Sequence, residues 1–248
     1  MTLGSLFDGI GGFPLAAIRY GIRPVWASEI EAFPIAVTKY RFPDMIHVGD
    51  ITKLDGAKLP PVDVICGGSP CQDLSVAGAR AGLAGERSGL FMEQIRVIRE
   101  MRDEDKRNGR TAQSVRPRYG VWENVPGALS SSGGRDFEKV LESFLRIEEP
   151  SLHVVRPETG RWEYAGAVLG IRSCVAWATW DARYFGVPQR RRRIFLIADF
   201  SGYSALQILF IQRSLQGNSS QGAGTGQGAS GNAGDGAEDP GRDRVVGM

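Results

Sequence analysis

The order of sequence patterns at the start of the chain constrains the fold more than any other feature. An apolar run typical of a strand covers residues 2–7, a turn of Asp-Gly-Ile-Gly-Gly covers residues 8–12, and helical apolar spacing covers residues 13–20. A glycine turn between a strand and a helix lets a ligand approach the backbone closely, and the amino terminus of a helix favours negative charge. The spacing Gly-x-Gly-Gly differs from the Gly-x-Gly-x-x-Gly of dinucleotide sites. Asp8 suits a positively charged group, such as the amino group of a methionine moiety, better than it suits a pyrophosphate.

Strand-like and helical runs alternate along most of the chain. The strand-like runs cover residues 25–29, 47–51, 62–66, 119–122, 174–180 and 193–198, and the helical runs cover residues 32–40, 90–101 and 135–147. This alternation predicts an α/β fold with an open, mostly parallel, Rossmann-like sheet. We expect the last two strands to form an antiparallel hairpin at its edge, and residues 103–118 and 148–170 to be exposed or irregular connections.

The chain divides into three parts by its composition. Residues 1–200 carry the alternating pattern and are expected to form one catalytic domain, while residues 201–216 are expected to form a helix or a connector. Residues 217–248 consist mainly of Gly, Ser, Ala, Gln and Asn, a composition that buries too little apolar surface to offset its ordering entropy. We therefore expect this tail to be disordered.

Two acidic residues stand at the ends of strand-like runs, at the edge where parallel sheets bind their ligands. Glu29 lies 21 positions after Asp8, a spacing typical of an acid that binds ribose hydroxyls, and Ile30 beside it is placed to pack on a base. A surface glutamate at a strand end is an equally good interpretation of Glu29 viewed alone. Asp50 either accepts a hydrogen bond from an exocyclic amine or caps a turn.

A glycine-containing segment from Gly67 to Gly89 follows the strand-like run 62–66 and carries Ser-Pro-Cys-Gln near its start. A cysteine next to a proline, just past the carboxyl end of a strand, stands where parallel sheets place their chemistry. We therefore interpret Cys71 as a covalent nucleophile. The alternative is that Cys71 is a small buried residue, because free cysteine is among the most buried residue types. The repeated glycines favour a lid that closes over substrate.

Charged residues stand at two further strand ends. The run 119–122 leads directly to Glu123 and Asn124, which places a carboxylate at the same edge of the sheet as Cys71. Four consecutive arginines, residues 190–193, precede the last strand-like run. A basic run is usually a solvated face, so this cluster alone is a weak indication of a nucleic-acid ligand.

Net charge and cysteine content argue against several classes of function. The net charge is only +2, so overall charge does not indicate a nucleic-acid binder. The chain has three cysteines, two histidines and no Cys-x-x-Cys pair, so no metal is expected. The free thiols indicate a reducing, cytoplasmic setting. Since no apolar run approaches the roughly 18 residues of a membrane span, no membrane role is expected.

Several segments together resemble the motifs of the DNA (cytosine-5) methyltransferase family, in the family's order. They are Ser5–Phe13, Gly68–Ser75, Glu123–Val125 and Gln189–Arg193. The Pro-Cys-Gln and Glu-Asn-Val elements are specific when they occur together, whereas many folds share the glycine turn. The resemblance covers about residues 2–200, and it implies S-adenosylmethionine as cofactor and double-stranded DNA as partner.

The resemblance also implies roles for individual residues. The cofactor-binding residues would be Leu6, Phe7, Asp8, Gly9, Gly11, Gly12, Glu29, Ile30, Asp50, Ile51, Pro70 and Leu90. The catalytic residues would be Cys71, Glu123, Arg191 and Arg193, and the substrate-binding residues would be Gln72, Ser75, Arg87, Asn124 and Gln189. In the implied reaction the Cys71 thiolate adds to carbon 6 of a flipped-out cytosine, Glu123 donates a proton to N3, and carbon 5 then accepts the methyl group.

Other functions remain open on the sequence alone. The family continues past the arginine motif into a variable target-recognition region and a closing Gly-Asn element, and neither is identifiable in this chain. The chain is therefore alternatively a truncated, non-catalytic remnant, or one subunit of a split enzyme whose second chain supplies DNA recognition. A third interpretation, an NAD-dependent oxidoreductase, is disfavoured by the glycine spacing and by Asp8.

Overall fold

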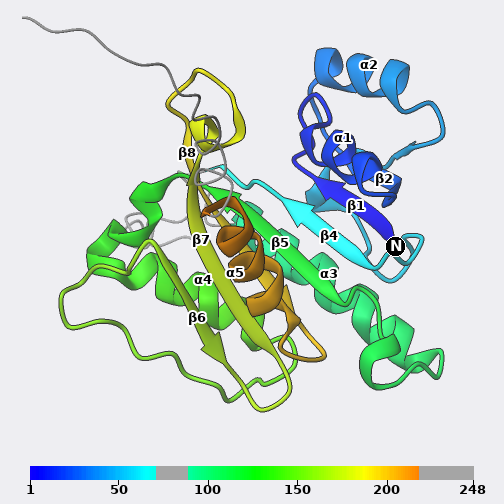
Figure 1. Cartoon of the computed structure of the whole chain (residues 1–248). Coiled ribbons are helices and arrows are strands. Elements are labelled where there is room, and N and C mark those ends of the chain that lie inside the picture. The colour runs from blue at the N-terminus through cyan, green and yellow to red at the C-terminus, as the bar shows by residue number, and fades with distance from the viewer. Residues whose placement is uncertain (71–88, 218–248) are drawn as a thin grey trace, which may run out of the picture.

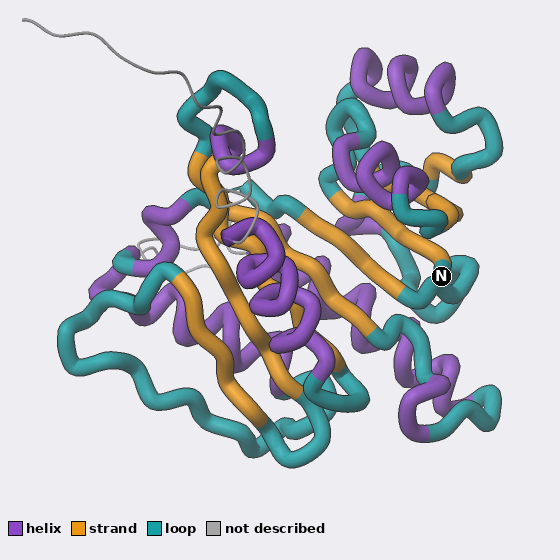
Figure 2. Tube along the Cα trace, in the orientation of Figure 1, coloured by secondary structure: helices purple, strands orange, loops and turns teal. Residues whose placement is uncertain are grey.

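The computed structural model of the chain describes residues 1–70 and 89–217, whose strands form one sheet with helices on both faces (Figures 1 and 2). The strands are β1 (Thr2–Leu6), β2 (Arg23–Ser28), β3 (Ile46–His47), β4 (Val64–Gly67), β5 (Tyr119–Asn124), β6 (Ala165–Leu169), β7 (Cys174–Asp181) and β8 (Arg192–Asp199). The α-helices are α1 (Gly12–Arg19), α2 (Ala32–Arg41), α3 (Gly89–Arg107), α4 (Arg135–Leu145) and α5 (Ser204–Gly217). Short 3₁₀ helices are η1 (Ile51–Lys53), η4 (Ala112–Ser114), η5 (Pro126–Leu129), η6 (Ser131–Gly134) and η7 (Ala182–Phe185).

The strands lie in the order β3-β2-β1-β4-β5-β8-β7-β6. The five strands from β3 to β5 pair in parallel, and β8, β7 and β6 pair antiparallel to their neighbours. This arrangement confirms the predicted α/β fold with a mostly parallel sheet and an antiparallel edge. The edge holds one strand more than the β7–β8 hairpin, because β6 lies within the segment 148–170. The prediction of an irregular course is therefore wrong for residues 165–169.

The helices α3 and α4 pack on one face of the sheet, and α1 and α5 pack on the other. Aromatic residues of α3 and α4 contact those of the strands edge to face, with ring centroids 6.0 Å apart for Phe91 and Trp122 and 5.3 Å apart for Phe137 and Trp177. On the opposite face α5 packs against β7, where Ala176 is one of the small residues that let a helix approach closely. The α1 helix covers β1 and β4 on that same side of the sheet. The core thus holds β4 and β5, the two central strands, in fixed positions.

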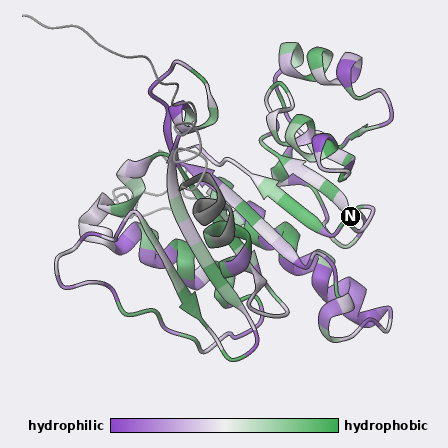
Figure 3. Ribbon diagram, viewed as in Figure 1, coloured by the Kyte–Doolittle hydropathy of each residue, from purple (hydrophilic) through white to green (hydrophobic). Residues whose placement is uncertain are grey.

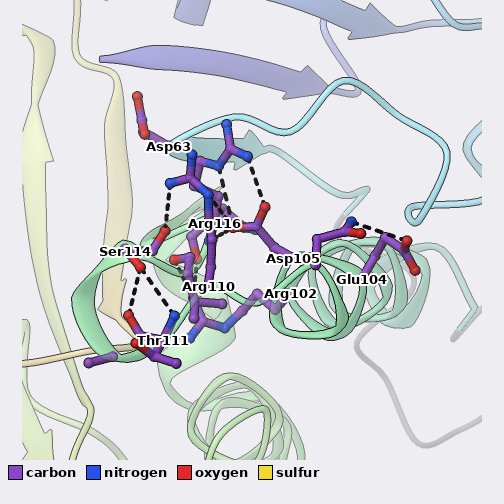
Figure 4. A network of polar contacts seen from close by, with 12 residues as sticks. Asp63, Arg102, Glu104, Asp105, Arg110, Thr111, Ser114 and Arg116 are labelled. Atoms are coloured by element: carbon purple, nitrogen blue, oxygen red, sulfur yellow. Dashed lines mark hydrogen bonds and ion pairs between the residues drawn. The ribbon is translucent and has the colours of Figure 1, made fainter.

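The α3 helix is longer than its apolar spacing predicts. It continues to Arg107, and Arg102 and Asp105 in its second half are only 1% and 5% exposed. The prediction of an exposed connection over residues 103–118 is therefore wrong for residues 103–107, whereas residues 108–114 are exposed as predicted. The charges of Arg102 and Asp105 are paired. Arg102 Nε lies 2.8 Å from Glu148 Oε1. Arg116 Nη2 lies 2.8 Å from Asp105 Oδ1 (Figure 4). Pairing offsets part of the cost of burying these charges, and the apolar periodicity of a sequence does not reveal them.

Among the described residues, none of the helices combines the length and the apolar character that crossing a bilayer requires. The α5 helix occupies the segment expected to be a helix or connector. The predicted disordered tail from residue 218 onward lies outside the described residues.

Candidate active site

The ends of four strands meet at one edge of the sheet, the one at which the parallel strands have their carboxyl ends. The register pairs Leu6 of β1 with Gly67 of β4, and Gly67 with Trp122 of β5. On the antiparallel side Glu123 pairs with Phe195 of β8. The glycine turn after β1, the segment after β4, Glu123 and the arginines before β8 are therefore neighbours at this edge, as the sequence predicts.

The turn after β1 requires glycine. Gly9 and Gly11 have φ angles of 55° and 85°, in the left-handed region that glycine adopts easily, and Phe7 before them has a φ of 52°. A Cβ on Gly11 would lie 2.6 Å from the Phe42 ring, so this glycine also allows α1 to pack near the end of α2. By contrast, a Cβ on Gly9 or Gly12 would meet nothing within 4 Å. The turn therefore faces open space at these two residues.

Asp8 is buried in this turn with one of its oxygens unpaired. Ser5 Oγ donates a hydrogen bond to Asp8 Oδ1 at 2.6 Å, whereas Oδ2 is buried without a partner among the described residues. Burial raises the pKa of Asp8 from 3.8 to about 6; the Ser5 hydrogen bond lowers it, and the negative charge of Glu29 raises it. A buried oxygen without a partner costs free energy unless a donor reaches it. Asp8 is therefore a candidate contact for a positively charged ligand group that can donate a hydrogen bond.

Glu29 links the glycine turn to the end of β2. Its Oε2 accepts a hydrogen bond from the Gly9 N–H at 2.8 Å, and its Oε1 accepts from the N–H groups of Ile30 and Glu31 at 2.7 and 3.0 Å. A carboxylate offers about four lone-pair sites, so Glu29 keeps acceptor capacity for ligand hydroxyls. The Ile30 side chain is 69% exposed next to it and presents apolar surface. The predicted ribose and base contacts of these two residues stay predictions.

Asp50 caps the short helix η1. Its Oδ1 accepts from the Thr52 N–H at 3.0 Å and from Thr52 Oγ1 at 2.8 Å, and the backbone hydrogen bond is the main reason why the pKa of Asp50 is lowered. Of the two roles considered for Asp50, the turn cap is the one that the structure contains. Ile51, which follows it, is buried and joins the main core.

The segment that leads to Cys71 is attached to β5. Ser69 is 4% exposed; its Oγ accepts from the Trp122 Nε1–H at 3.1 Å, and its carbonyl oxygen accepts from Asn124 Nδ2 at 3.2 Å. A Cβ on Gly68 would lie 3.1 Å from Glu123 Oε2, so the backbone passes directly beside that carboxylate. Asn124, predicted to bind substrate, is itself buried, and its Oδ1 accepts from the next N–H in the chain.

Two arginines converge on Glu123. Arg193 Nε lies 3.0 Å from Glu123 Oε1, and Arg191 Nη2 lies 3.8 Å from the same oxygen. The side chains of Glu123 and Arg193 are about a quarter exposed, and that of Arg191 is about half exposed. The structure thus brings together three of the four predicted catalytic residues, with Glu123 Oε2 turned toward Gly68.

The turn between β7 and β8 is held by Asp181, a residue that the sequence analysis missed. Asp181 is buried, and its Oδ1 accepts from the N–H groups of Arg183 and Arg191, both at about the limit of a normal hydrogen bond. These bonds fix the backbone from which the Arg191 side chain reaches Glu123. An acid at the last position of a strand is the signal that would have indicated it. Gln189, predicted to bind substrate, is exposed in the same turn.

Other predicted site residues have simpler positions. Leu6 is buried in β1, Pro70 is exposed at the last described position before the gap, and Leu90 lies partly buried at the start of α3. The remaining four predicted residues lie outside the described residues: Cys71, Gln72, Ser75 and Arg87.

The two cysteines in the described part are buried. Burial raises the pKa of the Cys66 thiol, and the charge of Asp8 raises it further. Burial likewise raises the pKa of the Cys174 thiol. Thiols of this kind stay protonated at neutral pH and are poor nucleophiles. Within residues 1–70 and 89–217 there is no group of three or more acidic, histidine or cysteine side chains that could hold a metal ion.

A family model described as "C-5 cytosine-specific DNA methylase" matches residues 1–219. The chain is 36% identical to a protein of Escherichia phage P1 named DNA N-6-adenine-methyltransferase, over 80% of this chain and 28% of that protein. It is 32% identical to the type II methyltransferase M1.ScrFI of Lactococcus lactis subsp. cremoris, over 82% of this chain and 43% of that protein. The chain thus spans less than half the length of these two relatives.

Solved structures share the fold. The methyltransferase Dnmt2 of S. pombe superimposes with a TM-score of 0.54 at 18% identity, over 82% of this chain and 52% of that one. A protein encoded within an E. coli prophage and described as a DNA modification methyltransferase superimposes with a TM-score of 0.53 at 23% identity, over 80% of this chain and 46% of that one. The arrangement of the glycine turn, Glu123 and the arginines lies within the stretch that the family model matches. This chain belongs to the C-5 cytosine-specific DNA methylase family.

Proposed function

We propose that this chain transfers a methyl group from S-adenosylmethionine to carbon 5 of a cytosine in double-stranded DNA. The position of Glu123 is the observation that carries the proposal. Its Oε1 is held by Arg191 and Arg193, and its Oε2 is turned toward Gly68, in the segment that leads to Cys71. This geometry supports an acid that lies beside the backbone of Gly68, three residues before Cys71 in the sequence.

The turn after β1 fits S-adenosylmethionine. The unpaired Asp8 Oδ2 would accept from the amino group of the methionine part, and Glu29 would accept from the ribose hydroxyls. Gly9 and Gly12 leave the backbone open to close approach. When bound, the cofactor supplies an electrophilic methyl group.

The residues of this chain would supply the remaining chemistry. The Cys71 thiolate adds to carbon 6 and forms a C–S bond, while the Glu123 carboxyl gives its proton to N3, so that carbon 5 becomes an enamine-like nucleophile. Arg193 and Arg191 stabilise the carboxylate that forms on Glu123. After methylation a base removes the carbon 5 proton, N3 returns its proton and the C–S bond breaks, which releases the Cys71 thiolate. Before any of these steps, the target cytosine must leave the base stack of the DNA, at a cost of a few kcal/mol.

Methyl transfer by cysteine variants tests this proposal. The full chain is incubated with methyl-labelled S-adenosylmethionine and duplex DNA, and the DNA is digested to nucleosides. We expect label in 5-methylcytosine for the parent chain and for Cys174→Ala, and a loss of at least about a thousandfold for Cys71→Ala. Equal transfer by Cys71→Ala and the parent would refute the role of Cys71.

A duplex with 5-fluorocytosine at the target tests the covalent step separately. Fluorine cannot leave carbon 5 as a proton does, so the chain should stay attached to the DNA through Cys71. We expect a complex that survives denaturation, absent in Cys71→Ala. Turnover on ordinary DNA without such a complex would count against the covalent route.

Adenine methylation is a second candidate, because the relative from phage P1 is named an N-6-adenine methyltransferase. Label found in N6-methyladenine, and retained in Cys71→Ala, would establish it. The split-enzyme alternative makes a different prediction for the same assay. Cofactor binding without transfer, followed by transfer when a second protein is added, would favour that alternative.

A further inference from the structure

A hollow lies at the end of the sheet opposite the glycine turn, where the parallel strands begin. It opens where β5 begins and β8 ends, between the second half of α3, the loop through η4, and the turn that joins β8 to α5. Its volume is about 790 Å³, within the range of small-molecule sites. Glu123 stands near the other end of β5, about 13 Å away along the strand, so this hollow is separate from the candidate active site.

Positive charge dominates the walls of the hollow. The lining side chains that are charged at neutral pH are those of Arg102, Lys106, Arg110, Arg172 and Glu148. Four cations face one carboxylate, an excess of three positive charges, whereas the whole chain carries a net charge of only +2. Figure 3 shows the end of α3 and the loop after it as strongly hydrophilic. The lining of this hollow therefore carries more positive charge than the small net charge of the chain suggests.

The floor of the hollow is the buried side chain of Arg102, which several contacts hold in place. Arg102 is 1% exposed, its Nε lies 2.8 Å from Glu148 Oε1, and its Nη1 donates to the Val115 carbonyl oxygen at 3.2 Å. Its guanidinium also lies over the Phe200 ring, 5.0 Å from the ring centroid. Lys106 Nζ lies 2.8 Å from the same Glu148 oxygen. One carboxylate oxygen thus balances two cations, which leaves this floor net positive.

The two remaining arginines have donors available. Arg110 Nη1 donates to the Ser114 carbonyl oxygen at 3.1 Å, but its Nε lies 3.6 Å from Asp105, which pairs more closely with Arg116 (Figure 4). Within the described residues the Arg172 side chain makes no hydrogen bond or ion pair. Guanidinium groups with free donors are the usual ligands of phosphate.

We propose that this hollow binds a small molecule that carries a diphosphate group. Arg102 and Lys106 provide a fixed positive floor, and Arg110 and Arg172 supply donors from the walls. An excess of three positive charges suits the two to three negative charges of a diphosphate at neutral pH better than the charge of a single carboxylate. Ser201, also on the lining, adds a hydroxyl donor.

Calorimetric titration of the full chain with inorganic pyrophosphate, at constant ionic strength, tests the proposal. We expect saturable binding to one site. Arg110→Gln and Arg172→Gln should each weaken it about tenfold, the effect of losing one charge-assisted hydrogen bond. Lys139→Gln, which removes an exposed cation of α4, should leave the affinity unchanged. Because the Arg172 side chain has no internal partner in the described part, its variant should fold like the parent. The absence of saturable binding, or equal losses in all three variants, would overturn the proposal.

Three further titrations identify the ligand class. Adenosine diphosphate that binds more tightly than pyrophosphate would show that a nucleoside is recognised, and equal affinities would show that the diphosphate alone is; both results support the site. Sulfate that binds as tightly as pyrophosphate would reduce the hollow to unspecific ion binding and overturn the proposal. A short DNA duplex that displaces pyrophosphate and is weakened by the same two variants would overturn it as well. None of these measurements uses methyl transfer, so their outcome is independent of the function proposed above.

Discussion

Asp8 titrates well above the usual range of an aspartate in the folded protein. Its pKa rises from 3.8 to about 6 on folding. Between about pH 4 and pH 6 this carboxyl is therefore protonated in the folded protein and ionised in the unfolded chain. The folded state therefore loses stability as the pH rises from about 4 to about 6, and the full cost persists above pH 6.

Removal of this charge should stabilise the protein in the absence of ligand. Asp8→Asn keeps the acceptor for Ser5 and removes the buried charge. We expect it to raise the free energy of unfolding at pH 7 by on the order of 3 kcal/mol, and the gain should disappear below about pH 4. Urea denaturation between pH 4 and pH 8 measures both. Asp50→Asn, where the pKa is lowered instead, should show no such gain; a gain in Asp8→Asn that did not change with pH would contradict this account.

Glu123 is the proton donor in the proposed reaction. Glu123→Gln removes the proton donor and leaves Arg191 and Arg193 without their carboxylate. We expect the single-turnover rate of methyl transfer to fall by about 10²–10⁴-fold, the usual contribution of a general acid, with cofactor affinity unchanged. Glu138→Gln, which removes a Glu–Arg pair at 3.7 Å on α4, serves as control. A similar fall in that control would mean that the loss reflects folding rather than chemistry.

At the scale of the element, β5 positions the segment that leads to Cys71. Trp122→Phe keeps an aromatic ring in the core but removes the N–H that reaches Ser69. Since Ser69 is buried, we expect a loss of about 1–3 kcal/mol in the free energy of unfolding, together with slower methyl transfer. Trp26→Phe removes a comparable bond, from Nε1 to the Pro60 carbonyl oxygen at 2.9 Å, and should cost stability without slowing transfer. Chemical denaturation and single-turnover assays of both variants separate the two effects.

Elements with strong local patterns could be predicted from the sequence. The glycine turn, the central strands and the position of Glu123 follow from apolar runs and from the rule that parallel strands bring their carboxyl ends together. The second half of α3 could not be predicted, because its buried side chains are charged residues whose partners, such as Glu148, lie far along the chain. The short strand β6 has only the edge of β7 to specify it. The partners of Ser69 are likewise set by tertiary contact, which no local pattern encodes.

At the scale of the whole molecule, net charge and local charge act differently. A chain with a net charge of +2 attracts DNA weakly at long range, so its proposed DNA affinity depends on local arginines such as Arg190 and Arg191. We expect each of Arg190→Gln and Arg191→Gln to reduce the slope of log affinity against log salt by about one. Arg19→Gln, which removes an exposed cation at the end of α1, should leave the slope unchanged. Binding of a fluorescent duplex at several salt concentrations measures the slope, and identical slopes for all variants would exclude the arginine run from the DNA contact.

The burial of Cys66 and Cys174 has a practical consequence for chemical labelling. Both thiols are shielded in the folded core and have raised pKa values, so neither should react with an alkylating reagent such as iodoacetamide at neutral pH. With three cysteines in the chain, any adduct formed on the native protein then falls on Cys71. The rate of a single mass increase would report the ionisation of that one sulfur directly, without mutating a residue.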